Sequence, residues 1–322
     1  MKAILIREPG EADMLVYGDA PDPQLKPGEL LVRVRAAGVN RADVHQRKGN
    51  YPPPADASPI LGLEVAGEVV TPAGRWQVGD RVMAVVSGGG YAELAAVPAD
   101  IAMPVPEGFT FEQAAAIPEV FLTAYLNLFM LGRLQPGEIV LIHAGASGVG
   151  TAAIQLAGSI GARAFITAGS DDKLERCHEL GAELCVNYLR DSFARVVLEA
   201  TEGRGVDVIL DFIGEPYWDE NLAALARGGR LMLIGFLGGS RGNLELAPIM
   251  RKNLHVTGTT LRGTPMDDKI ALAKALTDFA IPRFESGALK PVVDSVYRLE
   301  DASEAHRYME SNRNIGKIVL TI

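Results

Sequence analysis

Residues 139–151 read Ile-Val-Leu-Ile-His-Ala-Gly-Ala-Ser-Gly-Val-Gly-Thr, an apolar run followed directly by a glycine-rich turn. The run predicts a buried strand, and the residues from about Val149 predict a helix that starts within the turn. Glycines let the backbone approach a pyrophosphate, and the first amides of the helix can donate hydrogen bonds to it. The glycines at 145, 148 and 150 depart from the strict G-x-G-x-x-G spacing, so the turn alone is weak evidence for a dinucleotide site.

Further apolar runs follow at regular intervals and supply the context that the turn needs. Helical stretches separate these runs, which cover residues 164–167, 184–187, 208–212, 231–234 and 254–259. Gly161 and Gly181 mark the ends of two helices, and Ser170 marks the start of the second. This alternation predicts a doubly wound parallel sheet of βαβ units. The alternative, a tight turn between strand and helix without a ligand, is disfavoured in that context.

The residues on either side have a different character. Residues 1 to about 120 are rich in glycine and proline, and their short alternating segments predict strands at 30–36, 64–71 and 91–97. Apolar residues at helical spacing over 111–131, interrupted by Pro118, predict two abutting helices.

The C-terminal part is expected to return to this first, β-rich domain. Its pattern predicts a long helix at 266–286, strands at 292–297 and 317–322, and a helix between them at 301–311. We therefore predict two domains: a β-rich domain of residues 1–121 and 263–322, and a nucleotide-binding domain of residues 122–262.

Composition narrows the classes of partner. The chain has 322 residues, a net charge of −9 and few aromatic residues, which makes a nucleic acid an unlikely partner because phosphate backbones require clustered Lys and Arg. Cys177 and Cys185 are the only cysteines, both in segments that predict burial, so neither a disulfide framework nor a four-cysteine zinc site is expected. No secretory signal and no apolar run of membrane-spanning length is found, and we expect a cytoplasmic protein without membrane contact.

The choice of dinucleotide depends on the end of the second strand of this domain. Residues 167–173 read Thr-Ala-Gly-Ser-Asp-Asp-Lys, so Gly169 and Ser170 stand where an acidic residue would bind the ribose of NAD. This leaves space for a 2′-phosphate, which Lys173 could reach from the first turn of the next helix. NADPH is favoured. Asp171 or Asp172 could instead take the ribose role, or simply favour the helix N-terminus electrostatically.

With these residues in view, the chain resembles the zinc-independent quinone oxidoreductases related to zeta-crystallin, in the medium-chain dehydrogenase/reductase superfamily. The resemblance spans nearly the whole chain. It is carried by Gly38-Val-Asn-Arg-Ala-Asp43, Leu61-Gly-Leu-Glu-Val-Ala-Gly67, Ala114-Ala-Ala-Ile-Pro118, Leu122-Thr-Ala-Tyr125, His143 to Gly150, Thr167-Ala-Gly-Ser170, Gly181-Ala182, Asn187-Tyr188 and Asn314-Ile-Gly-Lys317. It implies a Rossmann sheet plus a GroES-like catalytic domain.

The same resemblance implies that zinc is absent. Zinc-dependent relatives carry a Cys and a His where this chain has Asn40 and Leu63. A catalytic zinc needs three protein ligands, and Glu64 and Glu119 alone cannot supply them. An acceptor would then be polarised by hydrogen-bond donors, and hydride transfer would depend mainly on how the nicotinamide is positioned.

The resemblance also implies positions for the site residues. Asn40 and Thr123 would lie beside the nicotinamide, and Tyr51 in the substrate pocket. The remaining cofactor contacts would be Ser147, Gly148, Val149 and Gly150 at the pyrophosphate, Gly169, Ser170, Lys173 and Tyr188 at the 2′-phosphate, and Ile213, Phe236 and Leu261 along the groove.

The two candidates for a chemical role each have a plainer interpretation. The Tyr51 hydroxyl could donate to a developing oxyanion, or the ring could be a solvent-side aromatic before three prolines. Asn40 could orient the substrate or tie together its own loop. His143 is expected to be a packed or hydrogen-bonded residue, Cys177 a core residue, and Ser147 a phosphate contact rather than a nucleophile.

These features together predict an NADPH-dependent oxidoreductase that transfers hydride to a quinone or related small carbonyl acceptor. An enone or enoyl reductase of the same superfamily is an alternative with the same cofactor residues. A second alternative is a non-catalytic, zeta-crystallin-like protein that binds NADPH or RNA. The resemblance further implies a homodimer, formed by joining sheets near strands 231–234 and 254–259.

Overall fold

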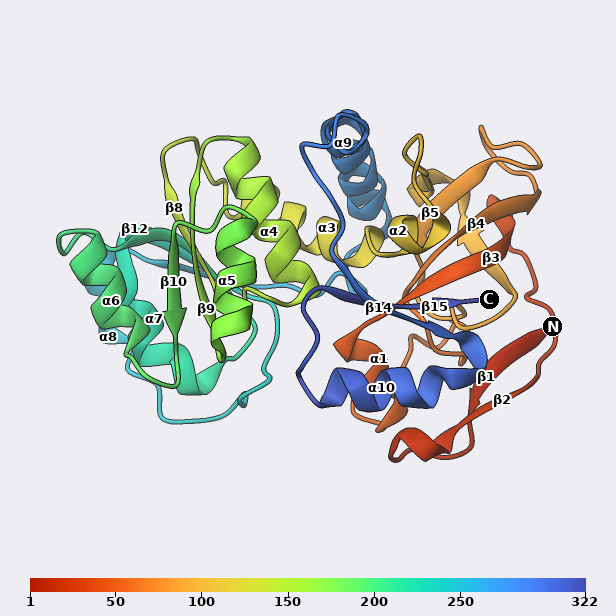
Figure 1. Ribbon diagram of the computed structural model, residues 1–322, viewed down its shortest axis with the longest axis horizontal. Helices are drawn as coiled ribbons and strands as arrows, with labels where there is room; N and C mark the ends of the chain where they lie inside the picture. Colours follow the sequence, from red (N-terminus) through yellow and green to blue (C-terminus); the bar gives the residue numbers. More distant parts are fainter. The chain divides into compact units, whose positions relative to one another are not determined.

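A computed structural model describes all 322 residues and divides them into two compact units (Figure 1). Unit 1 comprises Met1–Leu122 and Pro265–Ile322, and unit 2 comprises Thr123–Thr264. None of the helices combines the length and apolar character that crossing a membrane requires.

Unit 2 is built on a six-stranded, fully parallel sheet. Its strands, in the order β10-β9-β8-β11-β12-β13, are β8 (Ile139–Ile142), β9 (Arg163–Ala168), β10 (Leu184–Asn187), β11 (Val206–Asp211), β12 (Leu225–Leu233) and β13 (His255–Gly258). The order runs outward in both directions from β8 and β11, which is the doubly wound arrangement of a Rossmann fold. The predicted fold class is confirmed.

Helices connect these strands. They are α4 (Gly148–Ser159), α5 (Asp171–Glu179), α6 (Phe193–Ala200), α7 (Trp218–Ala224) and α8 (Ala247–Lys252). Gly161 and Gly181 follow the last turns of α4 and α5 with φ of +78° and +104°, a conformation that glycine adopts without steric cost. Cys177 is fully buried in α5, as predicted, whereas Cys185 is only partly buried because β10 is an edge strand.

Strand β12 differs from its predicted range, 231–234, since it begins at Leu225. The strand passes through the pair Gly228-Gly229 with a register shift against β11 and a φ of +77° at Gly228. β12 lies between β11 and β13, so its edges are already paired. Of the two strands predicted to join a second copy, only β13 has an outer edge.

Unit 1 contains a seven-stranded sheet and a two-stranded ribbon of β1 (Lys2–Ile6) with β2 (Leu15–Asp19). The sheet order is β14-β15-β3-β4-β5-β7, with β6 also paired to β3. These strands are β3 (Glu29–Val39), β4 (Glu64–Thr71), β5 (Arg81–Val85), β6 (Leu94–Pro98), β7 (Met103–Pro104), β14 (Val293–Arg298) and β15 (Lys317–Thr321). The β-rich character predicted for this part of the chain is confirmed.

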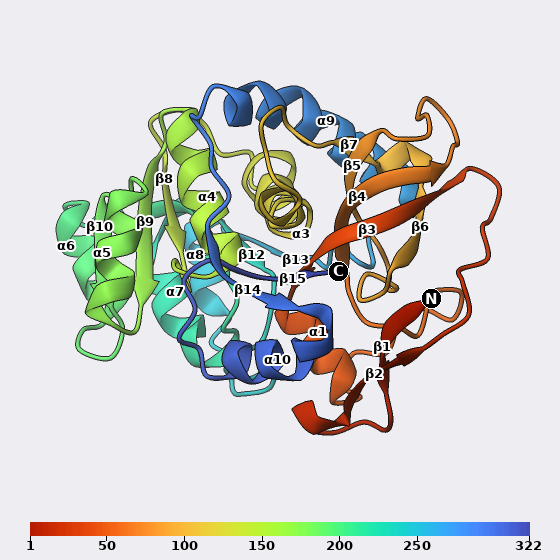
Figure 2. The same cartoon turned by 45° about the vertical axis from the view of Figure 1, so that its right-hand side comes forward.

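The C-terminal segment enters this sheet beside β3. Strand β15 pairs antiparallel with β3, with Ile318 opposite Val39, as can be followed in Figure 2. The helices of unit 1 are α1 (Arg41–Arg47), α2 (Phe111–Ala115), α9 (Met266–Glu285) and α10 (Ala302–Glu310). Because β15 begins at Lys317, this residue lies next to the end of β3, where α1 starts.

The segment 111–131, predicted as two helices, contains a third element. After α2 and α3 (Pro118–Tyr125), residues Leu126–Leu131 form a π-helical turn that ends at Gly132. The amide of Gly132 donates to the carbonyl oxygen of Asn127 at 3.1 Å, and a Cβ at position 132 would overlap with that oxygen. Glycine is thus required to close the wider turn, a constraint that the apolar spacing does not reveal.

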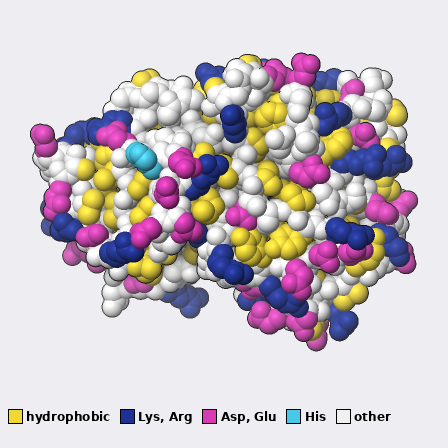
Figure 3. All heavy atoms as spheres, viewed as in Figure 1, with side chains coloured by type: hydrophobic (Ala, Val, Ile, Leu, Met, Phe, Trp, Pro, Cys, Tyr) yellow, Lys and Arg dark blue, Asp and Glu magenta, His cyan; other side chains and the backbone are white.

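Charged side chains of both signs lie side by side on the face shown in Figure 3. Acidic and basic groups are interspersed there, so that face carries no continuous basic stripe of the kind that follows a phosphate backbone.

Candidate functional site

The glycine-rich turn between β8 and α4 has the geometry of an anion-binding site. Ser147 is the N-cap of α4, which begins at Gly148, and its Oγ accepts a hydrogen bond from the amide of Gly150 at 3.0 Å. A Cβ at Gly145 would lie 2.7 Å from the Cβ of Ile166, and one at Gly150 would overlap with carbonyl oxygens of the turn. The glycines at 145 and 150 are therefore required by packing, and the first helix amides that do not take part in the cap could donate to an anion.

The predicted 2′-phosphate residues meet at the carboxyl ends of β9 and β10. Ser170 is the N-cap of α5, and Lys173 is the third residue of that helix. A Cβ at Gly169 would lie 2.8 Å from the hydroxyl oxygen of Tyr188, which means that the tyrosine ring lies directly against this glycine. Gly169, Ser170 and Tyr188 thus come together from the ends of two neighbouring strands, and their role at a 2′-phosphate stays a prediction.

A buried hydrogen-bonded chain fixes the end of β11. His143 Nε2 lies 2.7 Å from Asn221 Oδ1 and its Nδ1 lies 2.9 Å from Thr167 Oγ1. Because Asn221 Nδ2 donates to Asp211, its Oδ1 must accept from His143, so the imidazole is protonated on Nε2 and Thr167 donates to Nδ1. Asp211 in turn accepts from the amide of Ile213 at 2.7 Å. This row of hydrogen bonds thereby positions the backbone of Ile213, a predicted cofactor contact.

Burial keeps His143 neutral, and it lowers the pKa of the imidazole to about 4. In the unfolded chain the same group takes up a proton near its ordinary value of 6.5. The stability that neutral His143 contributes is therefore complete above that value and is lost as pH falls through the window from 6.5 to about 4.

We expect His143→Gln to remove this pH dependence. As pH falls from 7.5 to 4, the unaltered protein should lose roughly 3 kcal/mol more of its free energy of unfolding than the variant does. Urea titrations at several pH values would measure it. A constant difference across that range would show that His143 is not a buried neutral base.

The remaining predicted cofactor contacts of unit 2 lie in segments that hydrogen bonds join in pairs. The amide of Gly238 donates to the carbonyl oxygen of Ile213 at 2.9 Å, and this holds the loop that carries Phe236, whose side chain is 54% exposed. Asn127 joins the segment of Thr123 to the segment that leads to Leu261, since its Nδ2 donates to the carbonyl oxygen of Thr123 and its Oδ1 accepts from the Thr259 hydroxyl. Thr123 and Leu261 are both buried.

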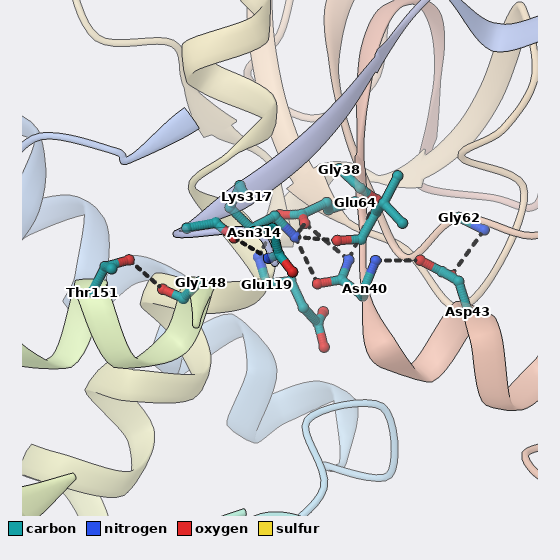
Figure 4. A network of polar contacts seen from close by, with 12 residues as sticks. Gly38, Asn40, Asp43, Gly62, Glu64, Glu119, Gly148, Thr151, Asn314 and Lys317 are labelled. Atoms are coloured by element: carbon teal, nitrogen blue, oxygen red, sulfur yellow. Dashed lines mark hydrogen bonds and ion pairs between the residues drawn. The ribbon is translucent and has the colours of Figure 1, made fainter. Parts of the chain in front are cut away.

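In unit 1, Asn40 lies at the start of α1 with its side chain fully engaged. Its Nδ2 donates to Glu64 Oε1 at 2.9 Å and approaches the carbonyl oxygen of Gly38 at 3.4 Å, while its Oδ1 accepts from Lys317 Nζ at 2.7 Å. Figure 4 shows these contacts. Of the two interpretations of Asn40, these bonds support the one in which it ties together its own loop, because no amide hydrogen is left to point at a substrate.

Lys317 and Glu64 form a buried ion pair that the sequence did not predict. Lys317 Nζ lies 2.6 Å from Glu64 Oε1 and also donates to the carbonyl oxygen of Val39 at 2.9 Å, and the two side chains are 4% and 0% exposed. With Asn40 Oδ1, these acceptors use all three ammonium hydrogens. The amide of Glu119 donates to Glu64 Oε2 at 2.8 Å. A lone lysine at the head of an apolar strand is the signal that could have indicated the pair.

Asp43 connects the loop of Asn40 to the loop that precedes β4. Its carboxylate accepts from the amide of Asn40 at 2.8 Å, from the amide of Gly62 at 3.3 Å and from the hydroxyl of Tyr91 at 3.2 Å. Burial raises the pKa of Asp43 to about 6, against the effect of these donors. The start of α1 at Asn40 and the start of β4 at Glu64 are therefore held by one carboxylate as well as by the ion pair.

A second row of buried hydrogen bonds runs from Arg47 through His306 and Tyr91 to Asp43. Arg47 can only donate, so His306 Nδ1 accepts from it at 3.3 Å and His306 Nε2 must carry the proton that it donates to Tyr91 at 3.2 Å. The Tyr91 hydroxyl then donates to Asp43. All four side chains are fully buried, and burial together with the nearby Arg47 lowers the pKa of His306 to about 3. The imidazole is a neutral connector in the core of unit 1.

The residues at this place do not fit a catalytic zinc. Asn40 is an amide, Leu63 is apolar, and the carboxylate of Glu64 is already paired with Lys317. The structure brings together no group of three or more His, Cys, Asp or Glu side chains that could hold a metal ion. The donor set that zinc requires is not formed by these side chains.

Tyr51 lies in the irregular segment between α1 and β4 and is partly buried. Its role as a hydrogen-bond donor to a substrate stays a prediction.

Two family models match the chain. Residues 26–107 match the "Alcohol dehydrogenase GroES-like domain", and residues 148–277 match the "Zinc-binding dehydrogenase". The first match falls in unit 1, and the second covers most of unit 2 and part of α9.

Curated relatives fall into two kinds. The chain is 33% identical to a quinone oxidoreductase of Sus scrofa, with 97% of this chain and 95% of the relative covered. It is 35% identical to a highly reducing polyketide synthase of Emericella nidulans over 99% of its own length, but it spans only 13% of that much longer protein.

Solved structures resemble the chain over its whole length. The Escherichia coli quinone oxidoreductase complexed with NADPH has a TM-score of 0.90 at 30% identity, with 100% of this chain and 100% of that chain covered. An NAD-dependent alcohol dehydrogenase has a TM-score of 0.89 at 34% identity, again with 100% of both chains covered.

Proposed function

Because this chain belongs to the medium-chain dehydrogenase/reductase superfamily, among its quinone-oxidoreductase-like members, we propose that it reduces a quinone or related small carbonyl acceptor with NADPH and without zinc. The chain is an oxidoreductase of the NAD(P)-dependent type. The observation that carries the finer proposal is the ribose end of the Rossmann unit, where Gly169 and Ser170 replace the acidic residue that NAD would need.

The residues of unit 2 fit NADPH. The first amides of α4 and the Ser147 hydroxyl would hold the pyrophosphate, and Ser170, Lys173 and Tyr188 would surround the 2′-phosphate. The side chains of Thr123, Ile213, Phe236 and Leu261 would line the rest of the groove. NADPH supplies a hydride from its nicotinamide ring, and with one proton from the surroundings this reduces the acceptor by two electrons.

Two residues of unit 1, Tyr51 and Asn40, would hold the acceptor in place, and neither would change its charge during the reaction. We propose that the Tyr51 hydroxyl donates to the acceptor oxygen as negative charge develops there. Asn40 would contribute to the wall of the site through its position, since Glu64 and Lys317 hold its amide. Without a Lewis acid, the rate would depend on how well these groups fix the distance between hydride and acceptor.

An enone or enoyl reductase is the second candidate, and the match to a highly reducing polyketide synthase favours it. The hydride would then go to the β-carbon of an activated double bond, and a proton would go to the α-carbon. The cofactor residues would be the same, so the two candidates differ in the acceptor alone.

The test is turnover, followed as the loss of NADPH absorbance with a panel of quinones and a panel of enones. We expect oxidation with quinones and a much slower reaction when NADH replaces NADPH. Faster turnover with enones would favour the second candidate. Tight NADPH binding without oxidation by any acceptor would contradict both and indicate a non-catalytic binding protein.

A further inference from the structure

Arg190 and Asp171 form a bidentate ion pair at the rim of the predicted 2′-phosphate pocket. Arg190 NH1 and NH2 lie 2.9 Å from Asp171 Oδ1 and Oδ2 respectively, and the side chains are 63% and 68% exposed. Asp171 is the first residue of α5, directly after Ser170. Arg190 follows Tyr188, whose hydroxyl lies against Gly169, by two residues. The pair therefore connects the two segments that form the pocket.

The backbone at Arg190 is held by a turn after β10. The amide of Arg190 donates to the carbonyl oxygen of Asn187 at 3.0 Å, and the amide of Leu189 donates to Asn187 Oδ1 at 3.0 Å. Asn187 itself is buried. The guanidinium is thus carried by a fixed backbone, while its exposed side chain can exchange one partner for another.

Both acidic residues that could have bound the ribose of NAD have partners within the pocket rim. Asp171 is taken by Arg190, and a hydrogen bond from the Ser170 side chain is the largest cause that holds the pKa of Asp172 below its ordinary value. To bind NAD, either carboxylate would have to share its oxygens between that partner and the ribose hydroxyls. The exposed guanidinium of Arg190 is therefore the charged group beside Ser170 that can exchange its present partner for a bound phosphate.

We propose that Arg190 is a further ligand of the 2′-phosphate, which Asp171 holds near the pocket until NADPH arrives. This rests on the proposed function, because it requires NADPH to bind at this turn. A guanidinium binds phosphate through two parallel hydrogen bonds, and a phosphate monoester carries more negative charge than one carboxylate. An exposed ion pair contributes little stability, so Arg190 can leave Asp171 readily. Asp171 then acts as a competitor that sets how tightly NADPH binds.

The experiment measures dissociation constants by calorimetry for NADPH, NADH and 2′,5′-ADP. Arg190→Ala should weaken NADPH and 2′,5′-ADP about tenfold and leave NADH within twofold. Asp171→Asn should tighten NADPH a few-fold, and this gain should disappear in the double variant with Arg190→Ala. Arg163→Ala is the matched control, since it breaks a similar exposed pair with Glu183 at the other end of β9 and should change none of the constants.

The outcomes separate this inference from the function on which it rests. Equal losses of NADPH and NADH in Arg190→Ala, or no loss of NADPH, would overturn the role of Arg190 while NADPH binding by the unaltered protein stands. Selective weakening of NADH in Asp171→Asn would make Asp171 a ribose ligand and also overturn it. Failure of the unaltered protein to bind NADPH would remove the proposed function itself.

Discussion

Lys317→Met should lower the free energy of unfolding of unit 1 by about 3–5 kcal/mol, the range found when one partner of a buried ion pair is removed. The variant leaves the carboxylate of Glu64 in a place that is 0% exposed, with only the amides of Asn40 and Glu119 as donors. Methionine fills the volume of the lysine stem, so the loss reports the charge rather than a cavity.

The measurement can be confined to unit 1. Trp76 and Trp218 are the two tryptophans of the chain, and they are buried in unit 1 and unit 2 respectively. In a Trp218→Phe background, the fluorescence of Trp76 during a urea titration reports the unfolding of unit 1 alone.

Two further variants test the interpretation. Glu64→Gln combined with Lys317→Met removes both charges and should recover a large part of the loss. Lys274→Met breaks an exposed pair with Asp278 in α9 and should cost less than about 1 kcal/mol. If Lys317→Met cost no more than Lys274→Met, the pair would not be what holds the loops of Asn40 and Glu64 together.

Lys173→Ala should weaken NADPH binding about thirtyfold, equivalent to about 2 kcal/mol, and should leave NADH within twofold. The expected cause is the loss of one charge-assisted contact to the 2′-phosphate, a group that NADH lacks. Lys173→Arg should retain most of the affinity because it preserves the charge. Fluorescence or calorimetric titration with both nucleotides would measure the constants.

Arg176→Ala is the control for this variant, because Arg176 lies one turn further along α5 and pairs with Glu179. It should affect neither nucleotide. Equal losses of NADPH and NADH in Lys173→Ala would contradict the 2′-phosphate assignment, and they would instead indicate that the lysine supports the helix itself.

Local patterns in the sequence were sufficient for most of unit 2. The apolar runs and the glycines at 145, 161 and 181 each constrain a few neighbouring residues, and a parallel sheet follows from their alternation. The local pattern also pointed to Gly169, Ser170 and Lys173 as candidates for a 2′-phosphate site, whereas Tyr188 was implied by the family resemblance, and the site itself stays a prediction. Strand β12 was misjudged at its start because a glycine pair has the same local signature in a turn and in a bulge.

Contacts between distant residues were beyond such patterns. Lys317 and Glu64 are 253 positions apart, and nothing near either residue identifies the other. The hydrogen bonds of His143 and His306 could not be predicted either, because a histidine in an apolar segment does not reveal its partners or which of its nitrogens is protonated. The predicted role of Asn40 was left open between two interpretations for the same reason, and its partners were needed to distinguish them.

The way in which unit 1 is assembled from two separate stretches has a consequence for synthesis on the ribosome. Residues 123–264 are contiguous, so they can fold as soon as they emerge, whereas β3 must wait for β15 and for Lys317 to be translated. Until then the nascent chain carries the Glu64 carboxylate without its cation and β3 without one neighbour. A chaperone that shields exposed strand edges would be expected to act in that interval.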